Sequence, residues 1–182
     1  DHAVSDRLGA IFGDYPDRIN ERRAVYLHLL GEFENIYGNS DQAFLVRAPA
    51  RINLKGMHVD HRGGHVNYMA IDREIVIAVG ARDDDTVVLN DHEADRYGAQ
   101  SFSISEALPP NARGDWLSYI EQVDLVPGDW SNYIRAGVLK LQDHFKDRSL
   151  RGMNLLVNGN IPIGGGLSSS SALVVAACEA SL

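Results

Sequence analysis

PIGGGLSSSSAL, residues 162–173, combines three consecutive glycines with four consecutive serines. The apolar residues 155–157 before it predict a strand, and the Ala- and Val-rich residues after it predict a helix. Glycines let the backbone approach a ligand closely and adopt positive φ. Serines cap helix ends, and the N–H groups and partial positive charge of a helix N-terminus attract anions. The segment therefore predicts a phosphate-binding loop that opens a helix.

Two other phosphate motifs do not fit this loop. A Walker A motif needs a lysine before its final Ser or Thr, and the loop contains none. Gly164 and Gly166 match the first spacing of GxGxxG, but Ser169 stands at the third glycine position, so a dinucleotide site is weakly supported. A glycine-rich turn with ordinary helix caps is the simple alternative. The combination of glycines and serines between a strand and a helix disfavours it.

Size and charge restrict the partners of the chain. Its 182 residues are enough for one domain with a sizeable core. The net charge of −8 argues against nucleic acid and anionic membranes as partners, and no apolar run approaches the ~18 residues of a membrane span. Cys178 is the only cysteine, so no internal disulfide is possible and a reducing cytoplasm is expected.

The periodicity of apolar residues predicts strands first and then mixed helices and strands, which favours the α+β class. Residues 1–38 are predicted to be helical, with Gly38 at the C-cap. The predicted strands are 43–47 and 51–55, split by Pro49, then 67–71, 74–81, 86–90, 97–104 and 153–157. The predicted later helices are 116–123, 130–146 and 168–180.

A second informative stretch is RAPARINLKGMHVDHRGGHVNYMAID, residues 47–72. It gathers five charged or histidine side chains around the turn Gly63–Gly64: Arg51, His58, Asp60, His61 and Arg62. Directional donors and acceptors beside tight glycines suit a ligand with many hydroxyl groups. A charged hairpin loop with surface histidines is the alternative.

Three segments resemble one superfamily. PxGGGLSSSSAL resembles the nucleotide-phosphate motif of the GHMP kinases, residues 47–72 are similar to the galactokinase signature, and DWSNYIRAGV at 129–138 is similar to a galactokinase helix. The resemblance covers roughly residues 32–182. It implies an α+β GHMP-kinase N-terminal domain, like domain 2 of ribosomal protein S5, over 39–182, with residues 1–38 as a helical extension. The mixed sheet would pack against helices.

The resemblance also implies an activity, the phosphorylation by ATP of a monosaccharide at its anomeric C1 hydroxyl. Arg51 would lie near the transferred phosphoryl group, Ser170 would bind Mg²⁺, and four residues would bind the sugar: His58, Asp60, Gly63 and Gly64. The ATP phosphates would lie on Gly164, Gly165, Gly166, Leu167, Ser168, Ser169 and Ser170.

Three positions depart from the galactokinase signature. Met57 stands where galactokinases carry the glutamate expected to bind the sugar's C6 hydroxyl, and methionine is a weak acceptor. A pentose without that hydroxymethyl group, such as L-arabinose, is therefore our hypothesis for the substrate. His61 in place of tyrosine and Ala50 in place of glycine weaken a literal galactokinase assignment further.

Other functions stay open at this point. A GHMP kinase for a non-sugar alcohol and a non-catalytic sugar-sensing or sugar-binding relative both fit the phosphate loop. The sequence stops at Leu182 inside an apolar helical pattern, so we expect a truncated chain without the family's C-terminal domain and catalytic aspartate. Alone, it should show negligible kinase turnover.

Two acidic clusters and the cysteine have simpler explanations. Asp83–Asp85 and Asp91–Glu93 are each consecutive residues without metal-ligand spacing, which favours solvated turns over a metal site. Cys178 lies on the apolar face of the last predicted helix, which favours a core position.

Overall fold

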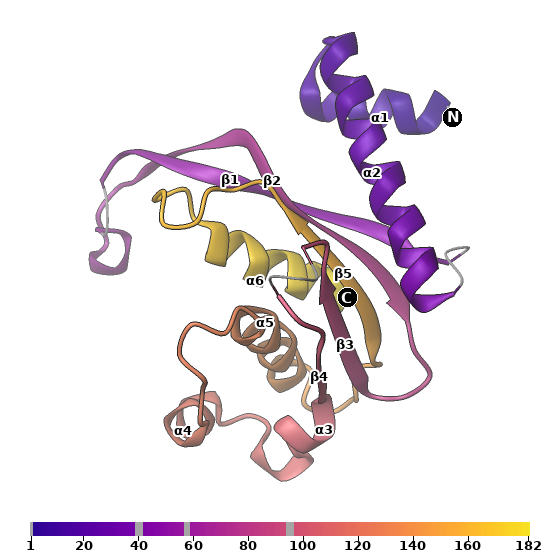
Figure 1. The fold of residues 1–182 in the computed structure, drawn as a ribbon. Coiled ribbons are helices and arrows are strands. Elements are labelled where there is room, and N and C mark those ends of the chain that lie inside the picture. The colour runs from indigo at the N-terminus through magenta and orange to yellow at the C-terminus, as the bar shows by residue number, and fades with distance from the viewer. Residues whose placement is uncertain (1, 39–41, 57–58, 94–96) are drawn as a thin grey trace.

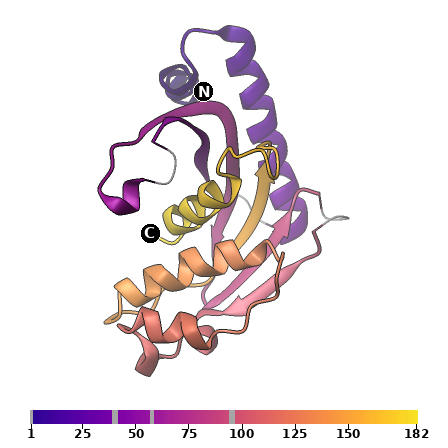
Figure 2. The same cartoon turned by 90° about the vertical axis from the view of Figure 1, so that its left-hand side faces the viewer.

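The computed structural model describes residues 2–38, 42–56, 59–93 and 97–182. Five strands form one sheet, and helices cover both of its faces (Figures 1 and 2). The strands are β1 Phe44–Lys55, β2 Asn67–Ala81, β3 Thr86–Asp91, β4 Gln100–Ser103 and β5 Met153–Gly159. The α-helices are α1 His2–Phe12, α2 Pro16–Tyr37, α3 Ile104–Ala107, α4 Trp116–Gln122, α5 Ser131–His144 and α6 Ser169–Ala180, and the short 3₁₀ turns are Asp60–Arg62 and Pro110–Ala112.

The sheet is mixed, as the resemblance implied. Its order is β1-β2-β5-β3-β4, and among the pairs of described strands only β3–β5 is parallel. The long hairpin of β1 and β2 extends beyond the other strands and ends in the loop that contains the 3₁₀ turn Asp60–Arg62 (Figure 1). None of the described helices has the length and apolar character needed to cross a bilayer.

Strand β2 separates two hydrophobic cores. Side chains alternate between the faces of a strand, so Val76 and Ala78 pack with Leu29 and Phe33 of α2. Ile77 and its neighbours on the other face join the larger core with α5 and α6. The continuous apolar run in the middle of β2 reflects this burial on both sides.

Two predicted strand breaks were wrong. Residues 44–55 form one strand, because β1 is the edge of the sheet and Pro49 needs no ladder hydrogen bond on its outer side. A register shift between Pro49 and Arg51 accommodates the irregularity. Residues 67–81 also form one strand. Strand β4 begins three residues later than predicted and ends at Ser103, whose hydroxyl accepts a hydrogen bond from the Glu106 N–H and begins α3.

Helix α2 is held on the sheet by a buried carboxylate. Glu74 of β2 is 3% exposed and accepts hydrogen bonds from the Tyr26 hydroxyl at 2.8 Å and from Arg47 Nε at 2.5 Å. The guanidinium of Arg22, 4% exposed, lies 3.6 Å from the same carboxylate. Burial, reinforced by the Glu74 carboxylate, raises the pKa of Tyr26 above its usual value. Arg22 also lies 3.4 Å from Asp72, whereas Glu74 is the acid that pairs with Arg47 among the described contacts.

Replacing that acid should be costly. We expect Glu74→Ala to lower the free energy of unfolding by about 3 kcal/mol, because it removes the acid paired with the partly buried Arg47 and leaves the buried Arg22 with Asp72 alone. Urea unfolding followed by circular dichroism measures this. Asp83→Ala is the control, since that exposed acid pairs only with the exposed Arg151 among the described contacts. A loss below about 1 kcal/mol for Glu74→Ala would contradict the assigned role.

Candidate functional site

A cleft of about 1420 Å³ opens between the β5–α6 loop, the β1–β2 hairpin and the end of β3. This volume exceeds the roughly 300–1,000 Å³ of a typical site for one small molecule. Its polar lining comes from distant parts of the sequence: Arg51, Asn53, Tyr68, Asp91, His92, Glu93, Tyr97, Tyr133, Asn158, Asn160 and Ser168–Ser171. The cleft is therefore lined by residues of both sequence motifs, 47–72 and 162–173.

The predicted loop has the backbone that its glycines were expected to provide. Gly164 and Gly166 have φ of 73° and 69°, and Gly165 N–H closes a turn on the Pro162 carbonyl. Ser168 has φ of 64° and is the one non-glycine residue in the described part of the chain with positive φ. Such a conformation costs energy in an L-residue and needs fixation by its surroundings.

Arg51 provides that fixation. Its Nε and Nη2 donate hydrogen bonds to the Ser168 hydroxyl at 3.1 and 2.7 Å, and its backbone N–H donates to the Leu167 carbonyl at 3.2 Å. The guanidinium also lies 4.0 Å from the centre of the Tyr68 ring. Strand β1 and the loop before α6 are therefore connected through both backbone and side chain.

The N-terminus of α6 faces the cleft without a side-chain cap from its N-cap residue. Ser168 occupies the N-cap, but its hydroxyl bonds to Arg51 and makes no capping bond in the described structure. The first N–H groups of a helix have no partner within the helix. Ser169 and Ser170 also line the cleft, so their N–H groups and hydroxyls are available to an anion there.

Helix α5 fixes the flank of α6. A Cβ on Gly137 would lie 2.8 Å from the Val174 carbonyl oxygen and 3.0 Å from Ala177 Cβ, so the helices approach at a point that needs glycine. The thiol of Cys178 lies 3.5 Å from the Gly137 carbonyl, and burial raises its pKa. Cys178, which was expected in the core, is partly buried between α5 and α6.

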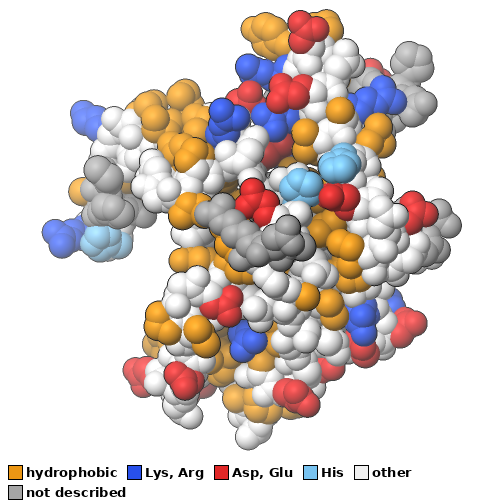
Figure 3. Space-filling model, in the orientation of Figure 1, with side chains coloured by type: hydrophobic (Ala, Val, Ile, Leu, Met, Phe, Trp, Pro, Cys, Tyr) orange, Lys and Arg blue, Asp and Glu red, His pale blue; other side chains and the backbone are white. Residues whose placement is uncertain are grey.

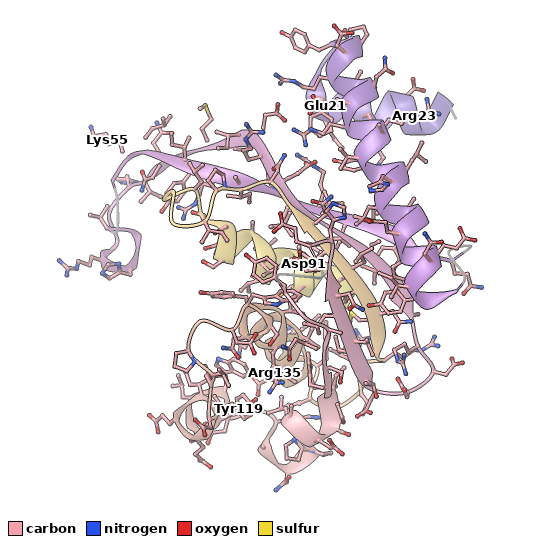
Figure 4. The ribbon with its side chains drawn as sticks, viewed as in Figure 1. Glu21, Arg23, Lys55, Asp91, Tyr119 and Arg135 are labelled. Carbon is pink, nitrogen blue, oxygen red and sulfur yellow. The ribbon has the colours of Figure 1, made fainter. Side chains whose placement is uncertain are left out.

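The opposite wall of the cleft carries aromatic and acidic groups. Tyr97 and Trp130 meet edge to face with ring centres 6.0 Å apart. Asp91, labelled in Figure 4, ends β3 and lines the cleft. These side chains were not predicted as site residues, because no local motif connects the end of β3 with the start of α5.

Asn53 is a further cleft residue, one to which the sequence motifs assigned no role. Its side-chain oxygen is buried and has no hydrogen-bond partner among the described residues, although the residue lines the cleft. A buried acceptor without a partner is costly, and a ligand donor would satisfy it. The sequence could have indicated that Asn53 lines the cleft, because residues two apart on a strand share a face and Arg51 is two positions away, but not that its oxygen has no partner.

The residues expected to bind a sugar lie near the tip of the β1–β2 hairpin. Met57 and His58 fall outside the described residues, and of Asp60 only the backbone, in the 3₁₀ turn, is described. Gly64 N–H donates to the Val59 carbonyl, and a Cβ on Gly64 would lie 2.8 Å from Val59 Cβ. Of the described residues that line the cleft, none belongs to the Gly63–Gly64 turn.

Two family descriptions match this chain, one over the β1–β2 hairpin and one over the segment with the phosphate loop. "Galactokinase galactose-binding signature" matches residues 31–81, and "GHMP kinases N terminal domain" matches residues 132–182. Both matches are to GHMP kinases, and the matched N-terminal domain carries the phosphate loop. The α+β fold and the mixed sheet expected from the resemblance are confirmed.

Several galactokinases are similar to this chain. The Dictyostelium discoideum galactokinase is 34% identical over 176 residues, covering 94% of this chain and 32% of its own length. The Candida parapsilosis galactokinase is 30% identical over 163 residues, covering 88% of this chain and 30% of its own. The structure of Lactococcus lactis galactokinase complexed with galactose superposes with a TM-score of 0.68 at 27% identity, covering 84% of this chain and 35% of that one. The chain thus spans about a third of the length of these relatives.

The close approach at Gly137 yields a prediction about the position of α6. Gly137→Val should lower the free energy of unfolding by about 1–3 kcal/mol, because the added side chain must push α5 and α6 apart. Urea unfolding measures the change. Gly31→Ala on α2 is the control, since no described atom lies within 4 Å of its Cβ position. If Gly137→Val leaves the free energy of unfolding unchanged, α5 and α6 can move apart without a loss of stability.

Proposed function

We propose that the whole protein transfers the γ-phosphoryl group of ATP to the anomeric C1 hydroxyl of a monosaccharide. The observation that carries this proposal is the contact between Arg51 and Ser168, which joins the galactokinase-like signature to the phosphate loop. Galactokinase relatives and a galactokinase structure support a sugar kinase as the broader class. Phosphoryl transfer depends mainly on positioning and charge neutralisation, and both motifs supply these.

The start of α6 fits the phosphates of ATP. Two positive-φ glycines keep side chains away from the loop, and the helix N-terminus lacks a cap from Ser168. In this proposal residues 164–170 bind phosphate oxygens through N–H groups and hydroxyls. The partly buried Ser170 hydroxyl is an oxygen donor of the kind that Mg²⁺ takes beside nucleotide phosphates, and bound Mg²⁺ would offset their charge.

Other parts of the cleft suit the remaining groups of the two substrates. The Tyr97–Trp130 pair offers an aromatic surface for the adenine base. Arg51 uses two of its five N–H groups on Ser168, so the others remain for the transferred phosphoryl group. The orphaned oxygen of Asn53 would accept a hydrogen bond from a ligand hydroxyl.

The sugar site is proposed at the hairpin tip, with His58, Asp60 and the backbone of Gly63 and Gly64. These roles rest on the resemblance to the galactokinase signature. L-Arabinose stays our hypothesis for the sugar because of Met57. The cytoplasmic location and the lack of nucleic-acid or membrane partners also stay predictions from charge and cysteine content.

Nucleotide binding tests the phosphate loop. We expect Gly166→Ala to weaken ATP binding roughly tenfold, because alanine disfavours the left-handed backbone and the free loop relaxes away from its cradle. Isothermal titration calorimetry with Mg²⁺ and a non-hydrolysable ATP analogue measures this. Gly31→Ala, far from the cleft, should bind the analogue as the unchanged protein does. Equal affinity in all three proteins would argue against this loop as the phosphate site.

The sugar preference tests the role of Met57. In the whole protein, kcat/KM for L-arabinose should exceed that for galactose, and Met57→Glu should shift the ratio toward galactose by about tenfold or more. ADP release coupled to NADH oxidation measures both. Preference for galactose in the unchanged protein would refute the pentose hypothesis. Binding of ATP and sugar without ADP release would instead identify a sugar sensor.

A further inference from the structure

Two histidines and a glutamate converge where α2 meets the end of β3. His28 Nε2 lies 3.5 Å from one carboxylate oxygen of Glu32, and His92 Nδ1 lies 2.6 Å from the other. The two imidazole rings meet edge to face, 5.6 Å between centres. Figure 3 shows histidine and acidic side chains gathered on the viewed face below the upper part of α2. We name His28, Glu32 and His92 the helix–strand cluster.

The backbone under the helix–strand cluster is rigidly placed. Residues four apart share one face of a helix, so His28 and Glu32 lie together. The residues that follow them, Leu29 and Phe33, are 0% and 1% exposed in the core beneath α2. His92 N–H donates to the Val157 carbonyl at 2.8 Å, which fixes the other side of the cluster to β5.

A hydrogen-bonded anchor joins the two elements nearby. Tyr37 of α2 donates its hydroxyl to the Leu155 carbonyl at 2.9 Å and accepts from Asn90 at 2.8 Å. Asn90 belongs to β3 and precedes His92 by two residues. Because both elements are fixed to the same sheet, the three side chains converge without any further ordering of the backbone.

The donor set is that of a transition-metal ion, and the 2.6 Å between His92 and Glu32 would have to widen by about 0.7 Å to reach the spacing of two zinc ligands. One donor atom from each residue lies within 4.8 Å of the other two. Two ligands of a tetrahedral zinc ion, each ~2.0–2.1 Å from the metal, are about 3.3 Å apart, close to the 3.5 Å between His28 and Glu32. We propose that the helix–strand cluster binds Zn²⁺ through two imidazole nitrogens and one carboxylate, with a fourth position open to water.

Zinc at this place would connect the N-terminal helices to the domain that carries the cleft. His28 and Glu32 belong to α2, whereas His92 lines the cleft next to Asp91. A metal ion that binds the folded chain and not the unfolded one stabilises it by mass action. The site is distinct from the proposed Mg²⁺ position at Ser170, since it uses nitrogen donors that Mg²⁺ disfavours.

Thermal unfolding with Zn²⁺ tests the proposal, using the protein freed of metal by a chelator. At a free Zn²⁺ concentration of about 100 times its Kd, the midpoint should rise by roughly 5–10 °C. His28→Ala, Glu32→Gln and His92→Ala should each weaken Zn²⁺ binding at least tenfold in calorimetry. His144→Ala, which removes an exposed histidine from α5, should leave binding unchanged. Mg²⁺ should produce no shift.

Cobalt(II) provides a second readout that does not depend on stability. Its visible absorption should show the strong bands of a four- or five-coordinate site in the unchanged protein and lose them in His92→Ala. Equal Zn²⁺ affinity in His92→Ala and the unchanged protein would overturn the proposal, as would a Zn²⁺ effect that disappears in His144→Ala. Because no nucleotide or sugar is present in these measurements, failure of the zinc site leaves the proposed kinase function untouched.

Discussion

Strand β2 is covered on both faces, by α2 on one side and by α5 and α6 on the other. Alternate side chains between Ile75 and Val79 enter two separate cores. A shift of one residue would exchange the faces and place Glu74 among apolar side chains, so the register is strongly fixed. Strands β1 and β5 pair with β2 on either side and take their positions from it. The two walls of the cleft that they carry are fixed in the same way.

The site uses that fixed frame to bring a cation to a helix N-terminus. Arg51 and Ser168 are 117 residues apart in the sequence and meet because β1 and α6 pack against β2. The contact satisfies the Ser168 hydroxyl, holds its left-handed backbone and leaves the first turn of α6 without that cap. In the kinase that we propose, one arginine thus shapes the phosphate loop and adds positive charge beside it.

Helix α2 contributes more than coverage of the sheet. It supplies Tyr26 and Arg22 to the buried Glu74 and offers His28 and Glu32 to the strand end that carries His92. Tyr26 and Arg22 attach α2 to the sheet through the buried charge of Glu74. His28 and Glu32 place donor atoms near the surface. A helix without a matching motif is therefore part of the domain's framework and adjoins the wall of the cleft.

The sequence by itself determined what depends on neighbours along the chain. The backbone at Gly164 and Gly166 was predictable because positive φ is a local property of glycine, and helices α2, α4, α5 and α6 followed from local periodicity, whereas α3 was not predicted. Only the tertiary structure decided that Pro49 lies in an unbroken edge strand, that the buried Asn53 oxygen has no hydrogen-bond partner among the described residues, and that His92 meets a histidine and a glutamate of α2. These contacts join residues far apart in the sequence, and such pairs are set by the path of the chain through the packed core, not by local preference.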